Sequence, residues 1–245
     1  MKEQLIVTLT TWKARIGNIP AVLDTVFNQT LPPDFVVLNL ATEEVIPEEV
    51  QAYIDSHRVE VNRVPDTKVY KKLIPTLNKY PEACVVAIDD DWLYPEGMLE
   101  EFMRIHKEHP DQPISGNRVF AFGTFFHCGC ASLCKRSFYG KYLDWCDKGL
   151  MAACESDDTF YTWCALKNGY RYIHTDNLYY ENMTPYHAVE AYTSNDTAPL
   201  ISWFYLCGRH GNPNKRKLKI WRRSIEIFFK SCGRKIAGLF KKEAQ

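Results

Sequence analysis

Three consecutive aspartates, Asp89, Asp90 and Asp91, follow directly after an apolar run at residues 84–88. Such a run has the length of a buried strand, and ligands of open α/β sheets bind beyond the carboxyl ends of strands. Adjacent carboxylates repel one another, so they favour a bound cation, and oxygen ligands suit Mg²⁺ and Mn²⁺. The alternative is a solvated turn whose acids cap the next helix, and the rest of the chain must decide between the two.

A second acid pair, Asp157 and Asp158, stands immediately before a predicted helix at residues 159–167. Short polar and acidic residues favour a helix N-terminus, where free backbone N–H groups and the helix dipole stabilise negative charge. A helix start can also direct a carboxylate into a cleft, so the capping role and a chemical role are compatible.

Two adjacent lysines, Lys71 and Lys72, precede the aspartate run by one short predicted helix. A lysine ammonium is a mobile point charge that suits a diphosphate, whereas most helix-surface lysines face water. We expect a functional role for one of the two, and Lys72 is preferred.

The strands that must position these residues alternate with helices along the chain. Strands are predicted at residues 5–9, 35–40, 59–64, 84–88 and 170–174. This alternation predicts an α/β fold with a mostly parallel sheet between helices, and right-handed crossovers bring the loops after the strands to one edge. Besides the aspartates, we expect five side chains to line one cleft there: Thr10, Arg15, Asp66, Lys71 and Lys72.

The later part of the chain has a less regular pattern. Residues 114–126 are predicted as strand with an aromatic-rich turn, and residues 175–213, with three prolines, as loop. Nine cysteines, an odd number, and no export-signal pattern at the start predict reduced cytosolic thiols that are mostly small buried residues. Zinc on His127, Cys128, Cys130 and Cys134 is the minor alternative, because their spacing is not that of a common zinc module.

The neutral net charge of the 245 residues conceals a basic end. Residues 209–245 carry twelve Lys/Arg and two Asp/Glu, a balance of +10, with apolar residues recurring at helical spacing. A basic amphipathic helix is typical of binding to anionic membranes, although it could also pack on the main domain. No apolar run approaches the roughly 18 residues of a membrane span, and no nucleic-acid-binding module is recognised.

Several motifs together resemble a known family. The segments at residues 9–16 (LTTWKARI), 70–75 (YKKLIP), 80–81 (YP) and 89–95 (DDDWLYP) are similar to those of bacterial A-type glycosyltransferases of the inverting, family-2-like kind. The resemblance covers residues 5–200 and implies a single Rossmann-like GT-A domain, placed at 1–208, followed by the basic helical tail at 209–245. The segment Cys128-Gly129-Cys130-Ala131 departs from it, because a more glycine-rich acceptor loop is expected there.

The resemblance implies an activity and its partners. A hexosyltransferase of this kind would move a sugar from a nucleoside diphosphate sugar, expected to be a UDP-sugar, to a glycan or lipid-linked acceptor. It would use Mn²⁺ or Mg²⁺ and serve cell-surface polysaccharide synthesis. With the tail on anionic lipid, the expected location is cytoplasmic, at the inner face of the plasma membrane.

The resemblance also suggests roles for the candidate residues. Side chains alternate along an extended segment, so Asp89 and Asp91 share one side; Asp91 is predicted as the direct metal ligand and Asp89 as a ligand of a metal-bound water or of the donor ribose. Two roles remain open for Asp90, which are donor binding and capping of the helix near Pro95. Donor contacts are expected from Thr10, Arg15, Asp66, Lys71 and Lys72, and the base that inversion needs from Asp157, slightly preferred, or Asp158.

Two other functions compete with glycosyl transfer. A nucleotidyltransferase on a similar sheet would use the same acids, but it would want a glycine-rich loop after the first strand, where Thr10-Thr11-Trp12-Lys13 stands instead. A non-catalytic adaptor that docks on membranes through the basic tail is the second, and the intact acid set argues against it.

Overall fold

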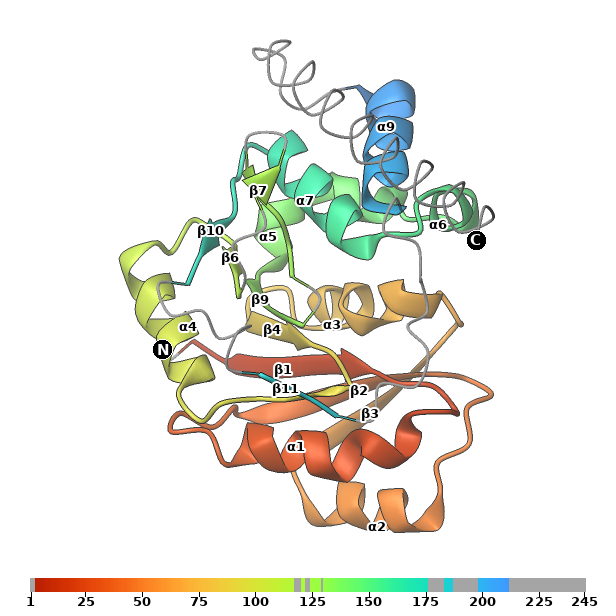
Figure 1. Cartoon of the computed structure of the whole chain (residues 1–245), viewed down its shortest axis with the longest axis vertical. Coiled ribbons are helices and arrows are strands. Elements are labelled where there is room, and N and C mark those ends of the chain that lie inside the picture. The colour runs from red at the N-terminus through yellow and green to blue at the C-terminus, as the bar shows by residue number, and fades with distance from the viewer. Residues whose placement is uncertain are drawn as a thin grey trace, which may run out of the picture.

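A computed structural model describes residues 3–116, 120–121, 124–128, 130–175, 183–186 and 198–211 of the chain. In its first part, strands and helices alternate as the sequence pattern predicts (Figure 1). The strands are β1 (Leu5–Thr10), β2 (Phe35–Ala41), β3 (Val59–Val64) and β4 (Cys84–Ile88). The helices between them are η1 (Ile16–Asn18), α1 (Ile19–Phe27), α2 (Glu48–Ser56), η2 (Lys68–Lys72) and α3 (Ile74–Lys79).

The second part has short strands and longer helices. Its strands are β5 (Trp92–Leu93), β6 (Ile114–Ser115), β7 (Phe120–Ala121), β8 (Thr124–Phe125), β9 (Ala131–Cys134), β10 (Ile173–His174) and β11 (Thr184–Pro185). Its helices are α4 (Met98–Glu108), α5 (Arg136–Tyr139), η3 (Gly140–Trp145), α6 (Lys148–Ala153), α7 (Asp157–Lys167) and α9 (Ala198–His210).

Seven strands form the central sheet in the order β10-β6-β9-β4-β1-β2-β3. The strands β4, β1, β2 and β3 are parallel, whereas β9 runs antiparallel between β4 and β6. The predicted α/β class with a mostly parallel sheet is therefore confirmed. Because β1 and β4 are parallel neighbours, the loops that follow them lie at the same edge of the sheet.

Strand alternation divides the core into two layers. On β1, Leu5, Val7 and Leu9 face one layer and Ile6 faces the other. The first layer includes the apolar sides of α1, α2 and α4, and the second includes those of α3, α5, α7 and α9. Figure 1 shows α1 and α2 below the sheet, with α3, α5 and α7 above it. The sheet is thus buried on both faces, which explains its near-continuous apolar strands.

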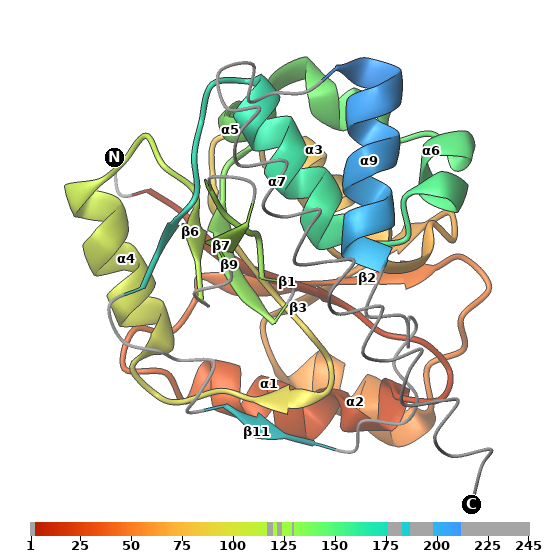
Figure 2. The same ribbon diagram turned by 45° about the horizontal axis from the view of Figure 1, so that its top comes forward.

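The prediction of loop throughout residues 175–213 is wrong, because α9 spans Ala198–His210. Pro199 occupies the first turn, where proline suits a helix, and Trp203, Leu206 and Cys207 recur at helical spacing and are buried. These residues place α9 against α7 (Figure 2). The helix also continues past residue 208, the predicted end of the main domain.

Two other predictions meet the structure in different ways. Residues 114–126 were expected to be strand with an aromatic-rich turn. In the described part of this range, β6 joins the central sheet and β7 pairs with β8 in antiparallel fashion, Phe120 opposite Phe125. The amphipathic helix expected from residue 215 lies outside the described residues. In the part of the chain that is described, no helix has the length and apolarity needed to cross a bilayer.

Candidate active site

The backbone of Asp89–Asp91 is held by one nearby side chain and by two groups from distant segments. The phenol of Tyr94 accepts from the N–H of the first aspartate (2.9 Å) and donates to its carbonyl (3.0 Å). The amide of Asn18 donates to the carbonyl of the second (3.2 Å), and the N–H of Tyr186 donates to that of the third (2.8 Å). Directly after Asp91, β5 pairs with β11. The conformation of the turn after β4 is therefore fixed by hydrogen bonds to the rest of the fold.

Arg15 pairs with two of the three aspartates. Its Nη2 lies 3.0 Å from Oδ1 of Asp90 and its Nη1 lies 2.5 Å from Oδ2 of Asp91. The arginine stands in the loop after β1, where its N–H donates to the carbonyl of Trp12. Burial raises the pKa of Asp90 to about 6, against the opposing effect of Arg15. The sequence placed Arg15 in this cleft, but its pairing with the acid motif was not predicted.

Lys72 joins the two acid motifs. Its Nζ lies 2.8 Å from Oδ1 of Asp89 and 3.6 Å from Oδ2 of Asp157. Burial opposes the charged form of this lysine, but the surrounding aspartates hold its pKa well above the usual range. The same ammonium lowers the pKa of Asp89, although burial acts in the opposite direction. The lysine is therefore a fixed positive charge between β4 and α7.

A buried polar cluster beneath η2 fixes the backbone of Lys72. The hydroxyl of Thr8 and the amide of Asn39 donate to the Lys72 carbonyl, at 2.7 and 3.2 Å. The Asn39 amide also donates to the hydroxyls of Thr8 and Thr76. Thr8 and Asn39 are polar residues within the apolar runs of β1 and β2, each flanked by apolar residues. That interruption was the sequence signal for these supporting residues.

At the start of α7, a serine caps the helix, and the two aspartates that follow it have other neighbours. The hydroxyl of Ser156 accepts from the N–H of Thr159 (3.3 Å), so this serine is the N-cap. Asp157 instead reaches Lys72, while the Asp158 side chain is 39% exposed. Burial raises the pKa of both carboxyls, and each carries one buried oxygen without a hydrogen-bond partner.

His127 stands behind Asp158 and was not predicted as a site residue. Its Nε2 lies 4.0 Å from Oδ1 of Asp158, and its backbone N–H donates to the hydroxyl of Thr162 (2.9 Å). Thr162 in turn donates to the backbone carbonyl of Asp158. Burial and the nearby Lys72 charge lower the pKa of His127 well below its usual range, so the imidazole is neutral. At 4.0 Å the two atoms form no hydrogen bond, and both are buried polar atoms without a hydrogen-bond partner.

The other nitrogen of His127 belongs to a buried network rather than to a zinc site. Its Nδ1 lies 3.0 Å from the hydroxyl of Tyr172, which lies 2.6 Å from that of Tyr139. The Tyr139 hydroxyl donates to Sγ of Cys134 (2.9 Å). All eight cysteines of the described residues are free thiols, buried or half-buried, as the composition indicated.

Three predicted donor residues have partners outside the acid motifs. Nζ of Lys71 lies 3.0 Å from Oδ1 of Asp66 and donates to the carbonyl of Lys68 (3.1 Å). Asp66 also accepts the N–H of Lys68, which holds a positive φ of 57°. The hydroxyl of Thr10 donates to the carbonyl of Asn39 (2.7 Å). The roles of Thr10, Asp66 and Lys71 as donor contacts remain predictions.

The acid cluster carries more negative than positive charge, so a cation would be stabilised beside it. The five carboxylates of residues 89–91 and 157–158 are matched by Arg15 and Lys72, which leaves three negative charges when all are ionised (5 − 2). Burial raises the pKa values of four of them. The described residues bring no three of these carboxylates together as a ready cage. That suits Mg²⁺ or Mn²⁺, which bind through one or two carboxylates together with substrate phosphates.

Exposure separates the three aspartates as strand alternation predicts. The side chain of Asp89 is 29% exposed and that of Asp91 is 16% exposed, whereas Asp90 is only 2% exposed. Asp89 and Asp91 are therefore the two carboxylates of the motif that solvent reaches.

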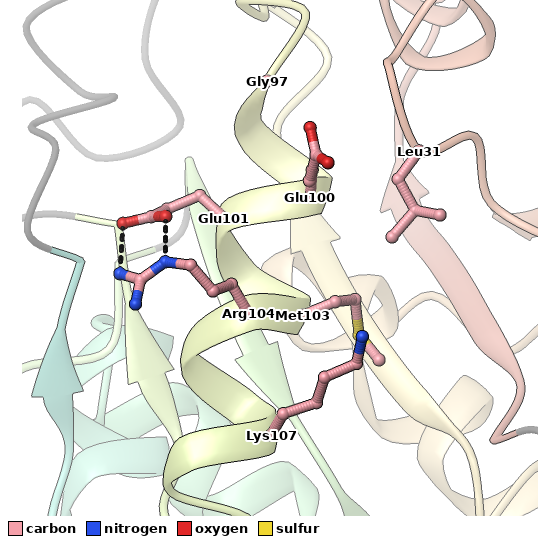
Figure 3. Close-up of a pocket in the computed structure, with 7 residues that line it drawn as sticks. All are labelled: Leu31, Gly97, Glu100, Glu101, Met103, Arg104 and Lys107. Carbon is pink, nitrogen blue, oxygen red and sulfur yellow. Dashed lines mark hydrogen bonds and ion pairs between the residues drawn. The ribbon is translucent and has the colours of Figure 1, made fainter.

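A surface pocket of 460 Å³ runs along α4, outside this cluster. Figure 3 shows its lining residues, which are Leu31, Gly97, Glu100, Glu101, Met103, Arg104 and Lys107. Glu101 receives two hydrogen bonds from Arg104, and Glu100 accepts one from Thr30. Both glutamates of this lining are therefore paired within the protein.

Two solved structures share the fold of this chain. The mannosyltransferase PcManGT of Pyrobaculum calidifontis, in complex with GDP-Man and Mn²⁺, has a TM-score of 0.57 at 19% identity over 73% of this chain. TarS of S. aureus, residues 1–349 in complex with UDP, has a TM-score of 0.53 at 14% identity over 72% of this chain. The chain has the fold of these glycosyltransferases.

The likeness is one of fold, and it is partial. The aligned region spans 56% of the mannosyltransferase chain and 59% of the TarS chain. A third structure, 4-diphosphocytidyl-2C-methyl-D-erythritol synthase, aligns over 84% of this chain and 99% of its own with a TM-score of 0.47 and 13% identity. No protein-family model matches the sequence, and no curated protein matches it either.

Proposed function

We propose that the chain is a metal-dependent glycosyltransferase that moves a sugar from a nucleoside diphosphate sugar to a glycan or lipid-linked acceptor. The observation that carries this proposal is the position of Lys72 between Asp89 and Asp157. Lys72 brings the two acid motifs side by side, and we infer that the first serves the diphosphate and its metal and the second supplies the base. The shared fold with two glycosyltransferases supports it.

On the donor side, Asp91 and Asp89 would hold Mn²⁺ or Mg²⁺. When bound, the ion stabilises the negative charge that develops on the departing diphosphate. Arg15 holds Asp91 in place through a paired guanidinium and balances the buried charge of Asp90. Asp90 thus supports the motif from inside the protein, and Thr10, Asp66 and Lys71 are the further donor contacts that we propose.

We assign Lys72 a positioning role. Its ammonium forms ion pairs with Asp89 and Asp157, and Thr8 and Asn39 hold its backbone carbonyl by hydrogen bonds. The lysine therefore keeps the donor and acceptor carboxylates at a constant separation. A diphosphate would meet this charge beside Asp89.

On the acceptor side, Asp158 is the better candidate for the base. Asp157 is engaged by Lys72, whereas the Asp158 side chain is half-exposed and faces neutral His127. Burial raises the pKa of Asp158, and a higher pKa makes a carboxylate a stronger base. Asp158 would take the proton of the acceptor hydroxyl while the hydroxyl oxygen bonds to the anomeric carbon. The bond from that carbon to the nucleoside diphosphate would break on the opposite side, with inversion.

Calorimetric titration with UDP and GDP, with and without Mn²⁺, tests the donor site. We expect Mn²⁺-dependent binding of at least one nucleotide, weakened at least tenfold in Asp91→Asn and unchanged in Asp55→Asn. Asp55 is an exposed carboxylate on α2, so its replacement controls for the loss of one negative charge. Equal binding by the parent chain and Asp91→Asn would remove Asp91 from the metal site.

A further inference from the structure

A second group of possible metal ligands lies at the start of β4, the end of this strand that is opposite to the aspartates. Glu3 precedes β1, Cys84 is the first residue of β4, and His106 is in the last turn of α4. One ligand atom from each lies within 4.8 Å of the other two. Asp89 follows the far end of the same strand β4, so this cluster is separate from the proposed active site.

The three side chains already contact one another. Nε2 of His106 lies 3.0 Å from Oε2 of Glu3, and the Cys84 thiol interacts with the same carboxylate. The Lys135 ammonium donates to the other oxygen, Oε1. Cys84 and His106 are buried, whereas the Glu3 side chain is 35% exposed. The cluster is thus rigid on the protein side and open to solvent beside Glu3.

We propose that Glu3, Cys84 and His106 form a zinc-binding site through Oε2, Sγ and Nε2. A carboxylate, a thiolate and an imidazole are the three ligand types that zinc takes in proteins. Tetrahedral bonds of about 2.0–2.1 Å place two such ligands roughly 3.3 Å apart, and the imidazole and carboxylate atoms are already 3.0 Å apart. The fourth position is left to water on the exposed side of Glu3.

Lys135 completes the site rather than blocking it. It bonds Oε1 and leaves Oε2 for the metal, and ligating carboxylates are normally held by such an outer hydrogen bond. Without a cation, burial and the Glu3 charge raise the pKa of the Cys84 thiol, so it stays protonated. Zinc takes cysteine as the thiolate, so binding would release that proton to solvent.

A bound zinc ion would cross-link three segments of the fold. It would tie the segment before β1 to the start of β4 and the end of α4, three places that are far apart in the sequence. A ligand that binds only the folded chain stabilises it by mass action. Zinc should therefore raise the melting temperature of this protein, and this inference does not rest on the proposed transferase activity.

Titration of the chelator-treated full chain with Co²⁺ tests the site. Thiolate coordination produces a ligand-to-metal absorption band that oxygen ligands do not, so cobalt at the aspartates does not interfere. We expect one equivalent of this band, displaced by Zn²⁺, lost in Cys84→Ser and at least tenfold weaker in His106→Gln. Cys130→Ser, a thiol near the aspartates, is the matched control and should retain it.

Two results would overturn the proposal. One is no thiolate band in the parent chain, and the other is a band that survives Cys84→Ser but disappears in Cys130→Ser. Thermal unfolding gives an independent check, since Zn²⁺ should raise the melting temperature of the parent and of Cys130→Ser more than that of His106→Gln. His106→Gln and Glu3→Gln decide the matter if Cys84→Ser does not fold.

Discussion

Lys72 is the residue on which both acid motifs depend. Its ammonium is nearly buried and lies within ion-pair distance of Asp89 and Asp157. Replacing it with methionine would leave two carboxylates uncompensated in a low-dielectric site, which is much costlier than losing a surface pair. We expect Lys72→Met to lower the free energy of unfolding by about 3 kcal/mol, the low end for a buried pair, because Asp89 is 29% exposed.

Lys71→Met is the matched control in the same denaturant titration. Lys71 pairs with Asp66, whose side chain is 57% exposed and stays solvated when its partner is removed. Its replacement should therefore cost about 1 kcal/mol or less. Equal losses in the two variants would mean that Lys72 does not compensate the buried acids.

Asp90 should leave a signature in the pH dependence of stability. Burial raises its folded pKa to about 6 from an ordinary value of 3.8. Between these values the folded chain binds more protons than the unfolded chain, so the free energy of unfolding falls as pH rises from about 4 to about 6. The contribution is of the order of 3 kcal/mol, and it is fully present only below the unfolded pKa.

Asp90→Asn isolates this effect because it keeps the shape and removes the titration. The difference in unfolding free energy between parent and variant should change by a few kcal/mol across the window from about pH 4 to about pH 6 and be flat above it. A constant difference over the whole range would show that Asp90 titrates normally.

At the scale of elements, α9 is the part of the chain that the sequence pattern concealed. Trp203 is fully buried against the layer that includes α7, and its ring centroid lies 6.0 Å from that of Phe126. Trp203→Ala should cost about 3–5 kcal/mol in unfolding free energy because a large cavity remains. Tyr205→Ala, on the partly exposed side of the same helix, should cost about 1 kcal/mol, and similar losses would contradict the packing of α9.

The strands and the acid motifs could be predicted from local sequence because periodicity and chain direction determine them. The runs at residues 5–9, 35–40, 59–64 and 84–88 became β1 to β4 with small shifts. The partners of the acids could not, since Arg15, Asn18 and Tyr186 reach them from 72 or more residues away. For α9, the prolines and the Asn195-Asp196 pair before it favoured the prediction of a loop. The helical spacing of its apolar residues stabilises a helix only because the folded chain buries them against α7.

At the scale of the whole molecule, the basic end remains a prediction. Residues 209–245 carry a balance of +10, and well-placed basic residues near an anionic surface contribute about 1 kcal/mol each. In flotation with phosphatidylserine-containing vesicles, the full chain should float at low salt, whereas a chain ending at Asn212 should stay at the bottom. Equal flotation of the two chains would reject a membrane role for this segment.

Turnover of nucleotide sugars tests the central claim most directly. With a panel of UDP- and GDP-sugars and Mn²⁺, the parent chain should release nucleoside diphosphate from at least one donor, and chelation should abolish the release. Asp158→Asn should still bind the nucleotide but turn over roughly 100- to 10,000-fold more slowly, while Asp55→Asn should match the parent. Release of pyrophosphate from nucleoside triphosphates with every sugar nucleotide left intact would contradict glycosyl transfer, as would full activity in Asp158→Asn.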